Sequence, residues 1–413
     1  MDVTRKPLST TLTQTPRATE PARPANQATT PRGGVQAVRD GFDAGSAGGA
    51  RRASNFVDRP TGLRPEQVSV PATAFAFGSS HVPVKAPEAR EVKAPGEPKP
   101  KPSGDPVIAV FDGGVDFRHT DLDGAMWTNP NEVAGDGKDN DGNGVTDDIH
   151  GFNVGFNSGD VLRGQGTDHG THVAGIIAAE DNGEGNTGVA AGKAKVLSVG
   201  GLYDGADLLT NFERGVDYVV KLKEEQGVNI RAVNASFGNE YPDAASQARW
   251  TAAVQKLADA DILLVAATAN GNGSNLNDVA DMPANLDLPN VLTVASMDKK
   301  NDKLADFSSY GDEVVELAAV GEDVLSTVPG GDWEEMSGTS MATPTVAGVA
   351  ARMFAENPTL TAAQVRDLLV QTVEVDADLK GKVSTSGKLD MEAALAAARE
   401  LAASQTPPEV VER

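Results

Sequence analysis

The feature that most constrains the fold is an alternation, from residue 106 onward, of short continuous apolar runs with longer segments of helical periodicity. A run of roughly four to eight apolar residues bounded by turn-forming residues is typical of a strand buried on both faces. Five runs predict strands of this kind: residues 107–111, 196–199, 232–236, 262–267 and 291–295.

The segments between these runs predict helices. In residues 206–225 the apolar side chains recur with a period of about 3.6, at Leu208, Leu209, Phe212, Val216, Val219 and Val220. Further helices are expected over residues 244–260, from Ser340 to 356, and over 361–372 and 389–402. Continuous strands separated by helices indicate an α/β fold of three layers, with a mostly parallel central sheet and helices on both faces.

The first part of the chain has a different composition. Residues 1–104 hold 14 of the 24 prolines and carry a net charge of +6, whereas residues 105–413 carry −29. We expect 1–104 to be a Pro/Ala-rich, largely disordered arm or prosegment. Within it, residues 68–77 could form one extended strand, and 93–102 a stiff linker. The folded domain is expected over 105–403, and a flexible tail over 404–413.

The overall composition excludes several classes of function. The chain has no cysteine, so it has neither disulfides nor thiolate nucleophiles. Its net charge of −23 disfavours nucleic acids and anionic membranes as partners. No apolar stretch is long enough to span a membrane, and residues 1–30 lack the apolar segment of a secretory signal. The protein is therefore expected either in the cytoplasm or outside the cell by a non-classical route.

One serine stands where a nucleophile is expected. Ser340 lies in the string Gly-Thr-Ser-Met-Ala-Thr-Pro, at the start of a run of small residues that predicts a buried helix. Backbone N–H groups and the positive end of the helix dipole can stabilise negative charge at that position. Serine is a weak nucleophile at neutral pH, and it needs a histidine base held in the right tautomer by a carboxylate.

Two other segments supply those groups. Asp112 directly follows the strand 107–111, at the end of a parallel strand where ligands commonly bind. His169 lies in the string Asp-His-Gly-Thr-His-Val-Ala-Gly, before another run of small residues. Taken alone, Asp112 could be a helix cap, and His169 with His172 could bind a metal ion. The order Asp, His, Ser is one of the orders known for serine triads.

These strings resemble the subtilisin-like serine peptidases, or subtilases, from about residue 106 to 402. The resemblance implies a subtilisin-like fold and a serine endopeptidase that hydrolyses peptide bonds through an acyl-enzyme intermediate. It assigns Asp112 as the orienting acid, His169 as the base and Ser340 as the nucleophile, and makes His172 a structural companion. Protein or peptide substrates, a monomer, and restraint by an inhibitory prosegment or a separate inhibitor are the corresponding expectations.

The same resemblance suggests the oxyanion-binding group. The strand 262–267 is followed by Thr-Ala-Asn-Gly-Asn-Gly, and the family places an asparagine amide there, so Asn270 is the candidate. An asparagine before glycine is also a common turn residue. The chain departs from the family pattern at Ala269, where glycine is usual, and at Gly113, where serine or threonine is usual.

Substrate is expected to lie as an added strand beside an exposed edge. In subtilases one such edge corresponds to Ser236, Phe237 and Gly238, which are the candidate contacts of the primary pocket. An alignment through Met282 and Pro283 puts Asp281 near the floor of that pocket. This would favour Lys or Arg before the cleaved bond.

An acidic, glycine-rich segment at residues 136–148 predicts calcium binding. Oxygen ligands alternate there with glycines, as in calcium loops, although the glutamate that ends an EF-hand loop is absent. The alternative is a solvated acidic turn, but so many like charges repel one another without a cation. The candidate ligands are Asp139, Asp141, Asn143, the carbonyl of Val145, and Asp147 or Asp148.

A second calcium site is suggested by the resemblance. It combines Asp121 with a loop that contains Asn182, Glu184 and Asn186. Calcium as a cofactor would fit an extracellular location better than a cytoplasmic one. Two competing functions remain: a catalytically silent binding scaffold, and a calcium-dependent adhesion protein.

Overall fold

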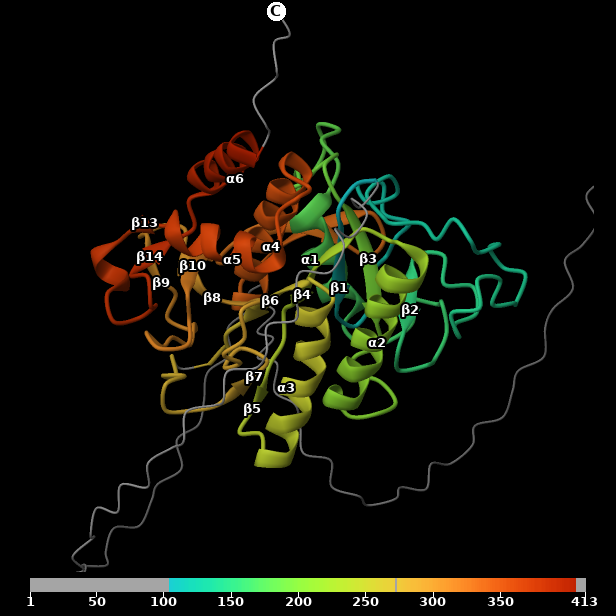
Figure 1. Ribbon diagram of the computed structural model, residues 1–413, viewed down its shortest axis with the longest axis horizontal. Coiled ribbons are helices and arrows are strands. Elements are labelled where there is room, and N and C mark those ends of the chain that lie inside the picture. The colour runs from blue at the N-terminus through green and yellow to red at the C-terminus, as the bar shows by residue number, and fades with distance from the viewer. Residues whose placement is uncertain (1–103, 272, 406–413) are drawn as a thin grey trace, which may run out of the picture. The chain divides into compact units, whose positions relative to one another are not determined.

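The computed structural model describes residues 104–271 and 273–405 (Figure 1). The arm predicted over 1–104 therefore lies outside the described residues except for Gly104, and so do its strand 68–77 and linker 93–102. Among the described helices, none is both long and apolar enough to cross a membrane.

The centre of the fold is a ten-stranded, mostly parallel sheet. Its strands run in the order β13-β14-β10-β8-β6-β4-β1-β3-β2, with β9 added beside β8. Only the β13–β14 and β8–β9 pairs are antiparallel. The strands are β1 (Val107–Phe111), β2 (Gly151–Asn153), β3 (Lys195–Gly200), β4 (Ile230–Ala235), β6 (Leu263–Ala267), β8 (Val291–Asp298), β9 (Lys303–Leu304), β10 (Leu317–Val320), β13 (Glu374–Val375) and β14 (Gly387–Lys388).

Helices cover both faces of this sheet. Figure 1 shows α2 (Leu208–Gln226) and α3 (Ala244–Asp259) on one side of the strands. The opposite side carries α4 (Thr339–Glu356), α5 (Ala362–Gln371) and α6 (Met391–Gln405). The three-layer α/β prediction is confirmed, and all five predicted strands and five predicted helices are present with ends shifted by a few residues.

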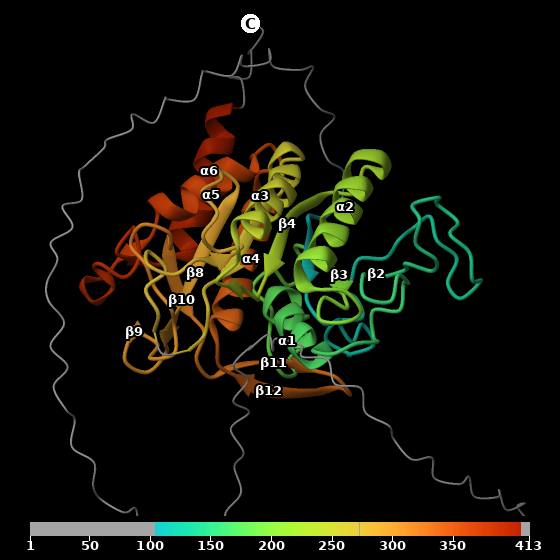
Figure 2. The same ribbon diagram turned by 90° about the horizontal axis from the view of Figure 1, so that it is seen from below.

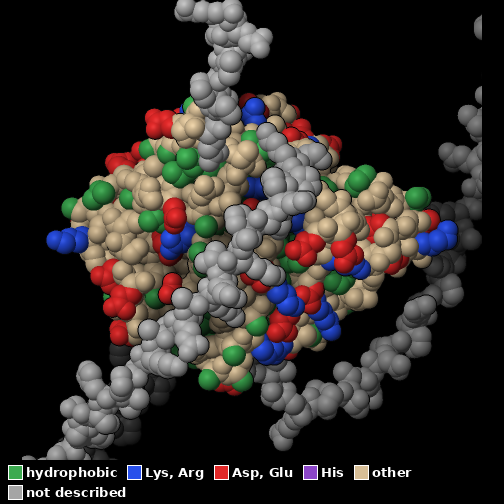
Figure 3. All heavy atoms as spheres, viewed as in Figure 1, with side chains coloured by type: hydrophobic (Ala, Val, Ile, Leu, Met, Phe, Trp, Pro, Cys, Tyr) green, Lys and Arg blue, Asp and Glu red, His purple; other side chains and the backbone are tan. Residues whose placement is uncertain are grey.

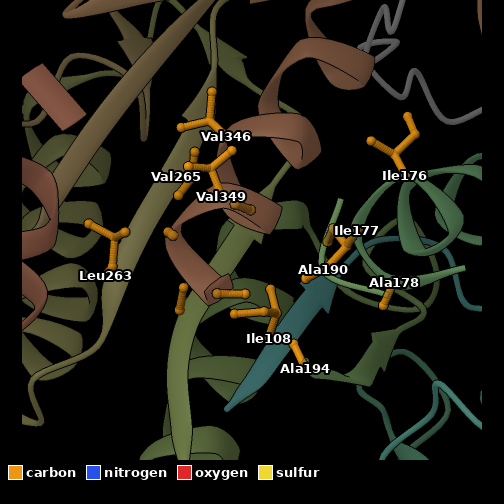
Figure 4. Close-up of a cluster of buried hydrophobic side chains, with 14 of the residues drawn as sticks. Ile108, Ile176, Ile177, Ala178, Ala190, Ala194, Leu263, Val265, Val346 and Val349 are labelled. Atoms are coloured by element: carbon orange, nitrogen blue, oxygen red, sulfur yellow. The ribbon is translucent and has the colours of Figure 1, made fainter. Parts of the chain in front are cut away.

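The alternation of side chains along β1 shows why both faces need cover. Ala109 and Phe111 point into the core beneath α2 and α3, whereas Ile108 and Val110 point into the core beneath α4. Figure 4 shows Val265 of β6 beside Val346 and Val349 of α4, and Ile108 belongs to the same buried cluster. Burial of both strand faces removes apolar surface from water and fixes the register of the sheet.

Two antiparallel strand pairs lie outside the central sheet, and only the second is a hairpin. β5 (Asn239–Glu240) pairs with β7 (Asp281–Met282), and β11 (Val324–Val328) pairs with β12 (Asp332–Met336). The β11–β12 hairpin packs against α1 (Thr167–Ala178), as Figure 2 shows. Neither pair follows from the sequence patterns, because the strands are short or alternate with polar residues.

Candidate active site

The first pair of candidate residues is joined by a hydrogen bond. Asp112 directly follows β1, and His169 lies in the first turn of α1. Nδ1 of His169 is 2.7 Å from Oδ2 of Asp112, and the two residues are 4% and 0% exposed. A carboxylate oxygen only accepts, so Nδ1 donates and the lone pair of this imidazole is left on Nε2.

The other oxygen of Asp112 is held by the backbone. The N–H of Gly113 donates to Oδ1 at 2.7 Å. A Cβ atom at position 113 would lie 1.9 Å from the carbonyl oxygen of Gln165 and 2.6 Å from Cα of Gly166. Glycine at this position thus has a steric cause, because the segment leading into α1 packs directly on it.

Ser340 is placed at the same edge of the sheet. It is the second residue of α4, is partly exposed, and its Oγ donates to the carbonyl of Ser236 at 3.1 Å. Ser236 follows β4, and β4 pairs with β1 so that Ala235 lies opposite Phe111. Asp112 and Ser236 therefore leave neighbouring strands at corresponding positions, and α1 packs against α4.

The candidate oxyanion donor is oriented by the start of α4. Asn270 follows β6, and its Oδ1 accepts from the backbone N–H of Thr339 at 2.9 Å and from Oγ1 of Thr339 at 3.1 Å. A backbone N–H can only donate, so the amide oxygen faces Thr339. The Nδ2 group is left on the other side, where a Cβ built on Gly338 would be 3.6 Å from it.

The substrate-binding candidates divide into two kinds. The side chain of Phe237 is buried in the core, with its ring centroid 6.1 Å from that of Phe212, so only its backbone can contact a ligand. Gly238 lies against the fully buried Asp281, because a Cβ at 238 would be 2.4 Å from Oδ1 of Asp281. The β5–β7 pairing brings these segments together and sets Glu240 opposite Asp281.

The acidic segment forms a compact loop, but with one unpredicted member. Ligand atoms of Glu132, Asp139 and Asp141 lie within 4.8 Å of one another, the one such acidic group among the described residues. Oε1 of Glu132 accepts from the backbone N–H groups of Asn140 and Asp141, at 2.6 and 3.1 Å. Its Oε2 is buried and has no hydrogen-bonding partner in the described part of the chain. The position of Glu132 shortly before the acidic segment is the sequence feature that could have identified it as a further ligand.

The remaining predicted calcium ligands make hydrogen bonds within the loop or to α2. Asn143 lies between the acids as a donor, and its own Oδ1 accepts from the N–H of Val145, whose side chain is buried. Asp147 keeps a buried Oδ1 that no donor in the described residues reaches. Asp148 accepts from the hydroxyl of Tyr218 at 2.6 Å, and burial raises the pKa of Asp148 to about 6.

The second acidic candidate is a buried carboxylate beside the β11–β12 hairpin. Asp121 accepts from Nδ2 of Asn182 at 2.8 Å and from the indole N–H of Trp333 at 2.7 Å. Asn186 donates to the carbonyl of Gly175 and keeps a buried Oδ1 without a partner among the described residues. Glu184 is exposed on the same loop, and its N–H donates to Asn182.

His172 has a different surrounding from His169. Its Nε2 lies 2.9 Å from the carbonyl oxygen of Glu334 on β12, and burial lowers its pKa to about 4. The two imidazoles of the motif thus contact different elements, and neither belongs to the acidic group described above. The arrangement argues against a metal ion held by this histidine pair.

The sequence of this chain is similar to those of several known proteins. Residues 103–389 match the model of the subtilase family. Subtilisin-like protease 1 of Plasmodium berghei is 34% identical over 302 residues, which are 69% of this chain and 48% of that protein. Subtilisin DY of Bacillus licheniformis is 35% identical over 221 residues, 52% of this chain and 74% of the relative. The chain spans about half the length of the Plasmodium proteins it matches.

Solved structures of proteases are also similar to this chain. The patellamide maturation protease PatA aligns with a TM-score of 0.53 at 27% identity, covering 71% of this chain and 97% of PatA. A cold-adapted subtilisin-like serine proteinase aligns with a TM-score of 0.50 at 27% identity, covering 68% of this chain and 88% of the proteinase.

Proposed function

The chain belongs to the subtilase family of subtilisin-like serine proteases, and we propose that it is a serine endopeptidase that cleaves peptide bonds through an acyl-enzyme intermediate. The observation that carries the proposal is the buried hydrogen bond between Asp112 and His169, at the sheet edge where Ser340 begins α4. Asp112, His169 and Ser340 form the catalytic triad in this proposal.

The first half of the reaction acylates the serine. Oγ of Ser340 attacks the carbonyl carbon of the scissile bond while its proton moves to Nε2 of His169. Asp112 accepts from Nδ1 and stabilises the imidazolium that forms. The hydroxyl hydrogen of Ser340, which points to the carbonyl of Ser236, has to turn toward His169 for this step. Such alignment commonly improves once substrate is bound.

Negative charge develops on the carbonyl oxygen during the attack. Nδ2 of Asn270 and the backbone N–H of Ser340 are the donors in the proposal, and the first turn of α4 adds its dipole. The fixed orientation of Asn270 supports this role, since Thr339 already occupies its amide oxygen. Collapse of the intermediate breaks the C–N bond, and the leaving amine takes the proton from His169.

The second half of the reaction releases the acyl group. A water molecule gives a proton to Nε2 of His169 and attacks the ester carbon. The bond to Oγ of Ser340 then breaks, and Oγ takes the proton back. Protein or peptide substrates are proposed to lie in extended form along residues 236–238, contacting backbone groups rather than the buried ring of Phe237.

A preference for basic residues is proposed for the primary pocket. The carboxyl group of Asp281 is buried directly behind Gly238, where any larger residue would clash with it. A buried carboxylate at the end of a pocket favours a Lys or Arg side chain that can pair with it.

Calcium binding by the acidic loop is also proposed, as a stabilising cofactor. Glu132, Asp139 and Asp141 fit a hard cation, since three carboxylates converge and Oε2 of Glu132 is buried without a donor. Figure 3 shows Asp and Glu side chains in scattered groups over the visible face, with Lys and Arg among them. A bound cation would offset the repulsion within this loop and hold it against α2.

The second calcium site is proposed around Asp121 and Asn182, with the buried oxygen of Asn186 as a further ligand. Asp121 is fully buried and both of its oxygens accept hydrogen bonds from neutral donors, so a cation there would supply the missing positive charge. Glu184 is a less direct candidate because it is exposed on that loop.

One experiment tests the proposed activity against the competing functions. The protein is incubated with a fluorophosphonate probe and, separately, with an unfolded protein substrate, with Ser340→Ala as the control. An active enzyme is labelled on Ser340 and degrades the substrate, and S340A does neither. A native protein that stays unlabelled and leaves the substrate intact is a silent scaffold or adhesion protein, and the proposal is then wrong.

A further inference from the structure

Ser236 and Ser340 exchange two hydrogen bonds. Oγ of Ser340 donates to the carbonyl oxygen of Ser236 at 3.1 Å, and Oγ of Ser236 donates to the carbonyl oxygen of Ser340 at 2.9 Å. The first bond holds the nucleophilic oxygen before reaction. The second acts on the main chain of the nucleophile, and nothing in the proposed reaction steps requires it.

The second bond has a cause in the sequence of α4. In an α-helix the carbonyl of residue i accepts from the N–H of residue i+4. The residue four positions after Ser340 is Pro344, inside the helix, and proline has no N–H. Oγ of Ser236 therefore supplies, from β4, a hydrogen bond that the helix itself cannot give to the Ser340 carbonyl.

A third side chain orients the donor. Asn234 is fully buried on β4, and its Nδ2 donates to Oγ of Ser236 at 2.9 Å. Because that oxygen already accepts from Asn234, its own hydrogen is directed to Ser340. The result is a chain of two hydrogen bonds, from the Asn234 amide through the Ser236 hydroxyl to the main chain of Ser340.

We propose that Asn234 and Ser236 are positioning residues, which fix the backbone of the nucleophile at the point where Pro344 interrupts the helix. The inference rests on the proposed peptidase activity. The backbone of Ser340 carries both its Oγ and the N–H proposed for the oxyanion, so a shift of this residue moves both groups. The Ser236 hydroxyl thus acts on turnover through Ser340 and not through contact with substrate.

Replacement of Pro344 provides a test that distinguishes a positioning role of Ser236 from a general contribution to stability. Full-length native protein, Ser236→Ala, Pro344→Ala and the double variant are compared for kcat and KM on a chromogenic peptide, with active sites counted by fluorophosphonate titration. S236A leaves the Ser340 carbonyl without its donor, and kcat should fall about ten- to a hundredfold with KM within about twofold. P344A restores an N–H in the helix, so removal of the Ser236 hydroxyl should cost much less kcat in that background.

The outcomes separate clearly. An unchanged kcat in S236A, or the same loss of kcat in both backgrounds, overturns the proposal. If S236A does not fold, Asn234→Asp replaces it, because a carboxylate only accepts and draws the Ser236 hydrogen away from Ser340. That variant should also lower kcat at constant KM, and a native kcat would again overturn the proposal. A native protein without any hydrolysis instead contradicts the peptidase activity itself.

Discussion

Nδ1 of His169 lies 2.7 Å from Oδ2 of Asp112, with both side chains buried at the carboxyl end of the central sheet. The contact joins two segments that are 57 residues apart in the chain. It fixes one tautomer of the imidazole, with the hydrogen on Nδ1.

Replacing Asp112 by Asn should reduce kcat by about 10⁴-fold, because an amide can hold His169 in the wrong tautomer. The measurement is kcat on a chromogenic peptide, with thermal unfolding to show that D112N is folded. Asp116→Asn is the matched control, since Asp116 is also a buried acid but bonds Arg118 and the backbone of Gly330. Equal losses in the two variants would contradict a specific role for Asp112.

Replacing Asn270 by Ala should lower kcat and leave KM nearly unchanged. The amide of Asn270 would act only on the charge that develops in the transition state, and loss of such a donor in subtilisin costs about 10²–10³-fold in kcat. Asn275→Ala, in the same loop but bonded to Asp278, is the control. A rise in KM without a fall in kcat would show that Asn270 binds substrate in its ground state instead.

Local patterns in the sequence were sufficient to predict the layered fold and the proximity of Asp112 and His169. The strand 107–111 is apolar at every position, so the residue after it had to emerge at a sheet edge. The β11–β12 hairpin has no continuous apolar run, because β12 reads Asp-Trp-Glu-Glu-Met. Its contacts outside the hairpin include His172 of α1, which is distant in the sequence. Its position is set by contacts with Thr171 and His172, about 155 residues earlier in the chain.

The acidic loop at residues 136–148 shows a second limit of sequence reasoning. Spacing predicted Asp139 and Asp141, and the structure brings them together. Glu132 joins them only because the loop folds back and offers two backbone N–H groups to its carboxylate. Asp148 is not part of this group, and it accepts a hydrogen bond from Tyr218, 70 residues later on α2. Contacts made by tertiary folding, and not spacing, decide which acids converge.

The buried carboxylate behind Gly238 predicts a substrate preference. Chromogenic peptides with Lys or Arg before the cleaved bond should have a higher kcat/KM than the matched Phe peptide, by tenfold or more, which corresponds to about 1.4 kcal/mol. In Asp281→Asn the order should reverse or disappear, since the amide has no charge to pair with Lys. A native preference for Phe would end the assignment of Asp281 to the pocket.

Removal of calcium should destabilise the protein. A ligand that binds only the folded state at 100 times its Kd adds about 2.7 kcal/mol, so chelation should lower Tm by about 5 °C or more. Glu132→Gln should reduce this difference, because it removes a charge from the carboxylate group. Asp136→Asn, in the same loop but outside that group, should keep it. A Tm that is the same with calcium and with chelator would contradict both proposed calcium sites.

His172 should make stability depend on pH. Burial lowers its pKa from 6.5 to about 4, and the nearby His169 acts in the same direction. The unfolded chain therefore binds a proton more readily than the folded one between these values. The contribution of neutral His172 is complete above about pH 6.5 and is lost as the pH falls toward 4, by about 3 kcal/mol in all.

Urea unfolding at pH 7, 5.5 and 4, at a fixed calcium concentration, measures this contribution. His172→Gln keeps a donor for the carbonyl of Glu334 but cannot take up a proton, so its free energy of unfolding should fall less steeply with acid than that of the native protein. His150→Gln is the control, because His150 is only partly buried and hydrogen-bonds the carbonyl of Trp127. If H172Q and the native protein lose stability in parallel between pH 7 and 4, then His172 is not the group that couples folding to acid, and other buried groups must carry that dependence.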